Sequence, residues 1–331
     1  MKVWIKFLIG SILGAICALV LPVENVAFSG FLSVVTEIVI RFGRYMVIPV
    51  MFFTVVIAFN RLRDTKLLLK TGAWIGIVIV ASSLILTVIG LISILVARIP
   101  RIPITVEKIP EIASLHIDNL LRALFPFSAF ESINNGTFLL SAYLFAMLIG
   151  TASTADPVLF RPVTQLADSL SKLMYNITVI FTEVFSIGMI AILCSWTIQF
   201  KDIILSGVYT PLIIVLLIDF VFVAGVVYPL ILRYLCHDPH PYKVLYASIC
   251  SLITAFFSGD SNLVLPLNIR HGKESLGIRR RINGVAQPLF SIFARGGSAL
   301  VTTVSFIVIW RSYSSLNIPF VDILWITFVS F

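Results

Sequence analysis

Long apolar segments alternate with short polar ones over the first two thirds of the chain. A helix needs about 20 apolar residues to cross the hydrocarbon core of a bilayer. Several of these segments are longer than one crossing requires, which predicts tilted helices. We expect six membrane helices in this part of the chain, at residues 3–22, 27–59, 71–97, 132–155, 165–200 and 203–235.

Residues 98–131 interrupt the pattern, because they are polar and rich in proline. Proline lacks a backbone N–H and disfavours a continuous helix. We expect a loop or a set of short interfacial helices here.

After residue 243 the apolar segments become too short to cross a membrane. Val244–Gly259 and Leu263–Ile269 flank a polar group of residues, Ser258–Asn262. Basic residues precede the first of these segments and follow the second, so both ends should face the same side of the membrane. Two short arms around a polar tip predict a re-entrant hairpin at about 243–270.

Residues 279–310 contain two half-length apolar segments, separated by the sequence Arg295-Gly-Gly-Ser298. Together they predict one crossing that is broken near its middle. Such breaks are tolerated where the freed backbone lines a cavity or packs within protein. A packed glycine kink is the alternative, but a guanidinium at this depth requires a partner or water.

The composition agrees with a membrane protein, since 59% of residues are hydrophobic and 12% are charged; soluble domains carry about 25% charged residues. The net charge of +8 does not indicate nucleic-acid binding, because the basic residues lie in short clusters between apolar segments. With a cytoplasmic N-terminus, the basic clusters at 61–70, 233–243 and 270–281 all lie on the cytoplasmic side. We expect a multi-pass protein of the cytoplasmic (inner) membrane, in which Arg41 and Arg44 extend to an interface.

The segment Cys236-His237-Asp238-Pro239-His240 contains residue types that bind metals. Its proline and the apolar segment before it favour a polar loop between helices instead. No metal site and no cofactor is predicted.

Four motifs resemble the dicarboxylate/amino acid:cation symporter family, the glutamate transporter homologues. Arg41–Thr54 (RFGRYMVIPVMFFT) is similar to the second-helix signature of that family, and Phe127–Gly136 (FSAFESINNG) to the start of its fourth helix. Thr254–Pro266 (TAFFSGDSNLVLP) resembles its first re-entrant hairpin, and Pro288–Ser298 (PLFSIFARGGS) its seventh helix. The resemblance covers essentially the whole chain.

The resemblance implies a glutamate-transporter-like fold, a homotrimer and elevator-like alternating access. Scaffold helices one and two would lie at 1–60, and helices four and five at 132–200, with the extracytoplasmic segment 98–131 before them. The transport domain would combine helix three at 66–97 with residues 203–331, which hold helix six, the hairpin, broken helix seven and a C-terminal apolar segment. Phe320–Phe331 ends without polar closing residues, so we expect a truncated chain that lacks the second hairpin and eighth helix of the family.

The resemblance also assigns a substrate site. The family's hairpin tip offers serines and backbone groups to the substrate, and the matching residues here are Asp260, Ser261 and Asn262. Arg295 joins this set as an expected partner of Asp260, although Asp260 could also cap the second hairpin arm. Ser298 begins the second half-helix, where the helix dipole favours an anion.

Four further positions match the ion site of the family: Ser82, Ser83, Ala294 and Gly296. The family has an asparagine and an aspartate at the last two, whereas alanine and glycine have no side-chain oxygen. We therefore expect that the sodium site is lost or is occupied by the Arg295 guanidinium. The two serines could instead bond to the backbone of their own helix.

These observations predict a secondary active, symporter-type transporter of an amino acid or dicarboxylate, with sodium coupling in doubt and Na⁺ or H⁺ left open as the coupling ion. A transport-inactive membrane remnant that keeps the fold is the alternative. An intramembrane hydrolase that uses Asp260 or Ser261 is disfavoured, because no second acid or base is placed beside them. We expect no enzymatic activity.

Overall fold

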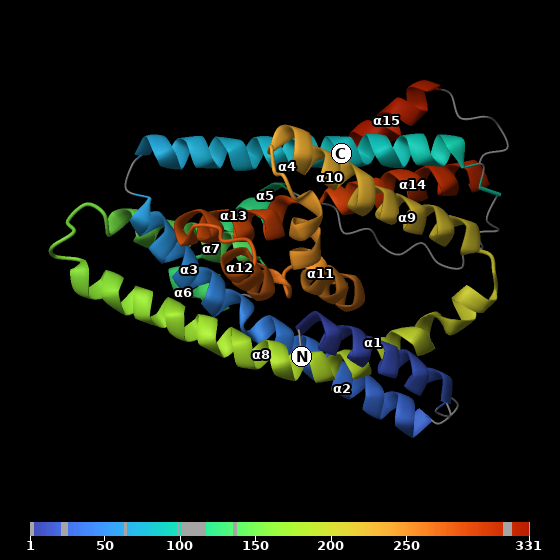
Figure 1. The fold of residues 1–331 in the computed structure, drawn as a ribbon, viewed down its shortest axis with the longest axis horizontal. Helices are drawn as coiled ribbons and strands as arrows, with labels where there is room; N and C mark the ends of the chain where they lie inside the picture. Colours follow the sequence, from blue (N-terminus) through green and yellow to red (C-terminus); the bar gives the residue numbers. More distant parts are fainter. Residues whose placement is uncertain are drawn as a thin grey trace. The chain divides into compact units, whose positions relative to one another are not determined.

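The computed structural model describes residues 3–20, 26–62, 65–97, 99–100, 117–134, 138–313 and 320–330 (Figure 1). These residues form helices joined by turns, and no strand occurs among them. Five helical stretches of the described chain are long and apolar enough to cross a membrane, at residues 28–61, 67–96, 161–201, 210–235 and 280–312. The predicted all-α polytopic membrane class is confirmed.

The first predicted helix is α1 (Val3–Val20), and the third is α4 (Thr65–Val96). The second is divided into α2 (Val26–Tyr45) and α3 (Val47–Arg61), with a turn at Met46. Pro49 accounts for the division, because its ring clashes with the carbonyl four residues earlier, that of Tyr45. The apolar pattern runs through this position without a sign of the break.

Two short helices, α5 (Ile117–Leu124) and α6 (Ala129–Asn134), lie in the segment predicted at 98–131, most of which falls outside the described residues. The predicted fourth crossing contains α7 (Leu139–Ala152), which at 14 residues is shorter than expected. Ser153 and Thr154 follow it, and their hydroxyls donate to the carbonyls of Gly150 and Thr151.

The fifth helix is α8 (Arg161–Leu205), and the sixth is a series of α9 (Thr210–Phe222), η1 (Val223–Val227), α10 (Tyr228–Leu230) and η2 (Ile231–Leu235). The two π-helical turns surround Pro229, which cannot donate to the Gly225 carbonyl. The Tyr242 hydroxyl donates to that carbonyl instead, at 3.4 Å.

The C-terminal part follows the predicted order of short arms and half-helices. The arms are α11 (Pro241–Ser258) and α12 (Leu265–Glu274). The half-helices are α13 (Arg280–Phe293) and α14 (Gly296–Tyr313), and α15 (Phe320–Ser330) follows. The helix break therefore lies at Ala294–Arg295, within one residue of its predicted start.

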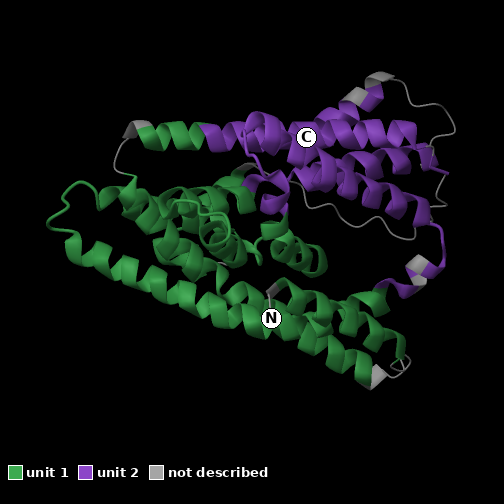
Figure 2. Ribbon diagram, in the orientation of Figure 1, with its two compact units in different colours: residues 1–73, 114–199, 246–292 green, residues 74–113, 200–245, 293–331 purple. Residues whose placement is uncertain are grey.

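The chain divides into two compact units (Figure 2). Unit 1 comprises residues 1–73, 114–199 and 246–292, and unit 2 comprises residues 74–113, 200–245 and 293–331. The core of unit 1 includes Phe7, Phe185, Met189, Leu263 and Leu267. That of unit 2 includes Leu86, Ile94, Val304, Ile307 and Ile323. The predicted division into scaffold and transport domains is not tested by these units and stays a prediction.

Within unit 1, α1 packs closely against α8 through two glycines. A Cβ atom on Gly10 would lie 2.6 Å from the carbonyl oxygen of Ser186, and one on Gly14 would lie 2.4 Å from that of Ile190. Real Cβ atoms do not approach an oxygen this closely. Small residues four apart allow two helix backbones to approach each other in membrane proteins, and this arrangement fixes α1 on α8.

Candidate functional site

The hairpin tip lies between α11 and α12 in unit 1. Gly259 has φ +64°, and its N–H donates to the Ala255 carbonyl, so it ends α11 in the left-handed conformation that glycine adopts readily. The Asp260 carboxylate then accepts a hydrogen bond from the backbone N–H of Asn262 at 2.9 Å. Asp260 therefore stabilises the turn before α12 rather than the first turn of the helix itself.

Asp260 also forms an ion pair with Arg44 of α2, at 2.7 Å from Nε to Oδ2. The Asp260 side chain is only 13% exposed, whereas that of Arg44 is 64% exposed. Arg41, which was expected to extend to an interface together with Arg44, pairs with Glu37 in its own helix. Arg44 thus contacts the hairpin tip, which the sequence did not indicate because 216 residues separate the two partners.

Ser291 of α13 joins the other two predicted tip residues. Its hydroxyl lies 3.0 Å from the side-chain oxygen of Asn262 and 3.3 Å from the backbone carbonyl of Ser261. Ser291 is buried. Sequence reasoning did not single it out, although its place one turn before the helix break was a usable signal.

Three of the predicted site residues, Ala294, Arg295 and Ser298, lie at the interruption between α13 and α14, in unit 2. Ala294 and Arg295 are non-helical, and Ala294, Arg295 and Ser298 are exposed. The Arg295 N–H donates to the Phe293 carbonyl, and the Arg295 carbonyl accepts from the Ala299 N–H. The first N–H groups of α14 are therefore presented at this break.

Three of the four predicted ion-site positions come together in unit 2. A Cβ atom on Gly296 would lie 2.7 Å from Leu86 Cδ1 and 3.4 Å from the Ser82 carbonyl oxygen, with the Ser83 backbone at 3.3 Å. The Ser82 hydroxyl donates to the Ile79 carbonyl at 3.0 Å, as expected for a serine that bonds to its own helix. Gly296 brings only backbone atoms to this group.

The predicted pair of Asp260 with Arg295 joins residues of different units and stays a prediction. In unit 1, the polar tip residues lie where the chain turns between α11 and α12. In unit 2, the residues of the break lie at the N-terminal end of α14.

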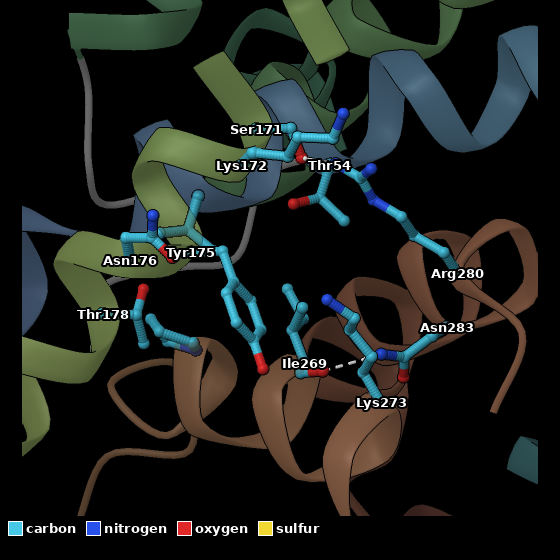
Figure 3. Close-up of a pocket in the computed structure, with 12 residues that line it drawn as sticks. Thr54, Ser171, Lys172, Tyr175, Asn176, Thr178, Ile269, Lys273, Arg280 and Asn283 are labelled. Carbon is cyan, nitrogen blue, oxygen red and sulfur yellow. Dashed lines mark hydrogen bonds between the residues drawn. The ribbon is translucent and has the colours of Figure 1, made fainter. Parts of the chain in front are cut away.

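Unit 1 also contains a cavity of about 290 Å³ that sequence reasoning did not single out (Figure 3). Residues of α3, α8, α12 and α13 line it: Val50, Thr54, Ser171, Lys172, Tyr175, Asn176, Thr178, Pro266, Ile269, Lys273, Arg280 and Asn283. Three of its side chains are cationic. In the sequence, Lys273 and Arg280 belong to the basic segment 270–281, and Lys172 belongs to the helix predicted at 165–200. Their proximity could not be predicted, because the sequence does not reveal which helices pack together.

Long apolar helices, a helical hairpin with a polar tip and a helix interrupted beside an arginine are features of multi-pass membrane transporters of small solutes. A comparison with known families places this protein further: the model of the sodium:dicarboxylate symporter family matches residues 3–331, and the chain belongs to this family. The resemblance inferred from the four motifs is confirmed. The family consists of transporters and not of enzymes.

Proposed function

We propose that the protein is a secondary active symporter of an amino acid or dicarboxylate across the cytoplasmic membrane. The observation that carries this proposal is the interruption at Ala294–Arg295, which presents an exposed guanidinium directly before the N-terminus of α14. Membership of the sodium:dicarboxylate symporter family supports the solute class.

The chemistry of the break suits a carboxylate. A guanidinium can bind both oxygens of a carboxylate at once. The unpaired N–H groups and the positive end of the helix dipole at the start of α14 favour the same charge. Ser298, in the first turn of α14, adds a hydroxyl. The resemblance to the family supports Asp260, Ser261 and Asn262 at the hairpin tip as further solute-binding residues.

The proposal includes a change in ion coupling. Sodium is bound by several oxygens, and Ala294 and Gly296 provide none from their side chains. The Ser82 hydroxyl donates a hydrogen bond within its own helix. We therefore expect that sodium does not bind at this position and that transport does not require a sodium gradient.

The resemblance to the family supports two further parts of the proposal, a homotrimer and elevator-like alternating access, and the proposed N-terminus is cytoplasmic. The positions of the basic clusters support the orientation independently.

The test is uptake into proteoliposomes that contain the purified full-length protein. Radiolabelled amino acids and dicarboxylates are supplied under imposed sodium, proton or potassium gradients. We expect uptake of at least one solute, and we expect it to persist when choline replaces sodium.

The variant R295Q should reduce uptake by roughly tenfold or more, because a charge-assisted hydrogen bond to the solute is lost. R41Q, which removes an exposed arginine paired within α2, is the control and should transport normally. Absence of uptake for every solute under every gradient would contradict the proposal and favour the transport-inactive alternative.

A further inference from the structure

The cavity in unit 1 lies on a different stretch of the hairpin from the tip. Pro266, Ile269 and Lys273 of α12 line it, whereas the tip is formed by Asp260, Ser261 and Asn262. Figure 3 shows the Lys273 side chain reaching into the space between α8 and α13. The lining of the cavity is therefore distinct from the residues of the proposed solute site.

Charge is unbalanced at this cavity. Arg61, Lys172 and Arg280 all pair with one carboxylate, that of Asp168. A second carboxylate, Glu274, pairs with Arg270. Together with Lys273, the described residues around the cavity comprise five cations and two carboxylates, so its described surroundings carry a net positive charge.

Lys273 is the cation with the weakest protein partner. Its ammonium lies 4.3 Å from the centroid of the Tyr175 ring, and it pairs with no carboxylate in the described part of the chain. Contacts of this kind contribute little at exposed sites. The Tyr175 hydroxyl itself is directed to Glu274. Lys273 can consequently turn to an anion at small cost.

The remaining walls define what kind of anion fits. The Arg280 guanidinium donates to the Ser171 hydroxyl at 2.8 Å, and Thr54 supplies a second hydroxyl to the lining. An arginine, two lysines and hydroxyls together are the groups that bind phosphate oxygens in proteins. Val50, Pro266 and Ile269 form an apolar part of the wall, which accommodates a small organic body beside the charged group.

We propose that this cavity binds a phosphate group, with Lys273, Lys172 and Arg280 as its cationic ligands. The phosphate belongs either to the headgroup of an anionic phospholipid or to a soluble phosphate, since both present the same oxygens. Binding there would link α3, α8, α12 and α13 of unit 1 without involving the proposed solute site.

The experiment measures the melting temperature of the full-length protein, purified in a neutral detergent. One arm adds inorganic phosphate against sodium chloride at equal ionic strength. The other adds phosphatidylglycerol against phosphatidylcholine in mixed micelles. A ligand that binds only the folded state raises the melting temperature, so at least one arm should show a rise, and the arm that does so identifies the source.

K273Q should weaken the apparent affinity for the effective ligand by roughly tenfold. The control is K70Q, which makes the same change on an exposed lysine of α4 that lies outside the cavity lining. Should K273Q prove unstable before any ligand is added, K172Q replaces it, because Asp168 retains Arg61 and Arg280 as partners. No rise in either arm, or an equal rise in wild type and in the cavity variant, would overturn the proposal.

Discussion

At the residue scale, the hairpin tip is held by one carboxylate with two functions. Asp260 accepts the Asn262 N–H with one oxygen and the Arg44 guanidinium with the other. Because Arg44 is largely exposed, solvent screens the pair, and its contribution to stability is modest. The turn bond inside the tip does not depend on this partner.

A double-mutant cycle of R44Q and D260N measures that contribution. We expect a coupling energy of about 0.5–1 kcal/mol, read from melting or denaturant unfolding in detergent. The Glu37–Arg41 pair, which is exposed at both ends, provides the comparison and should give about 0.3–0.5 kcal/mol. Coupling near zero for Asp260 and Arg44 would show that the contact does not position the tip.

His271 predicts a dependence of stability on pH. It lies in α12, outside the five candidate spans, and its Nε2 atom is buried without a hydrogen-bond partner among the described residues. Burial, assisted by the charge of Arg270 and opposed by that of Glu274, lowers the pKa of His271 below its usual 6.5. The unfolded chain therefore binds the proton first as the pH falls, and stability is lost from pH 6.5 down to the lower folded pKa.

H271N removes this titration. The melting temperature of wild type should fall between pH 7.5 and pH 5.5 by more than that of H271N. The pKa of the nearby Glu274 is also lowered: burial alone would raise it, but hydrogen bonds from Tyr175 and Arg270 favour the charged form. Its contribution is lost only below its usual 4.5, so the two effects occupy different pH ranges. An identical fall in both proteins would refute the assignment to His271.

At the element scale, α1 approaches the backbone of α8 closely at Gly14. G14A places a methyl group 2.4 Å from a backbone oxygen of α8, which cannot move away as a flexible side chain can. We expect α1 to be displaced and the protein to lose about 1–3 kcal/mol of stability, measured as a lower melting temperature.

Gly30 provides the matched control for this prediction. It lies in α2, and a Cβ atom there would meet no atom within 4 Å. G30A should leave stability unchanged or raise it by about 0.5–1 kcal/mol, since alanine is the better helix former. Equal effects of G14A and G30A would show that α1 does not depend on its close contact with α8.

The order of helices could be predicted from the sequence, and several of their ends could not. Apolar length indicated α1, α4, α8 and the α11–α12 hairpin within a few residues. The break at Met46 and the π-helical turns around Pro229 have the same cause, a proline inside an apolar segment. Apolar periodicity does not report such breaks, because they leave the apolar face intact, and weighing each proline against the carbonyl four residues earlier would have found them.

At the scale of the whole molecule, the predicted orientation can be tested with one native thiol. Cys236 is exposed, Cys194 and Cys250 are buried, and Cys17 is intermediate. Cys236 lies in the basic segment 233–243, which the charge pattern predicts to be cytoplasmic. A membrane-impermeant maleimide should therefore label it in inside-out vesicles and not in intact cells.

The variant C236S is the control and should lose that labelling. Labelling of Cys236 in intact cells, absent in C236S, would reverse the orientation of the chain.

The candidate site was predicted only in part. One motif named Asp260, Ser261 and Asn262 and another named Gly296, because each motif resembles a fixed stretch of the family pattern. Arg44 and Ser291 are tertiary partners that a pattern along the chain cannot supply. The cavity beside α12 could not be predicted for the same reason, since its cations come from helices far apart in the sequence.

The shared use of Asp168 by Arg61, Lys172 and Arg280 constrains how this protein can diverge. A mutation to asparagine would remove the carboxylate that pairs with all three cations and leave them to repel one another. Homologues that lack an acid at this position should therefore have replaced at least one of the basic residues as well, so that the four sites vary together rather than singly.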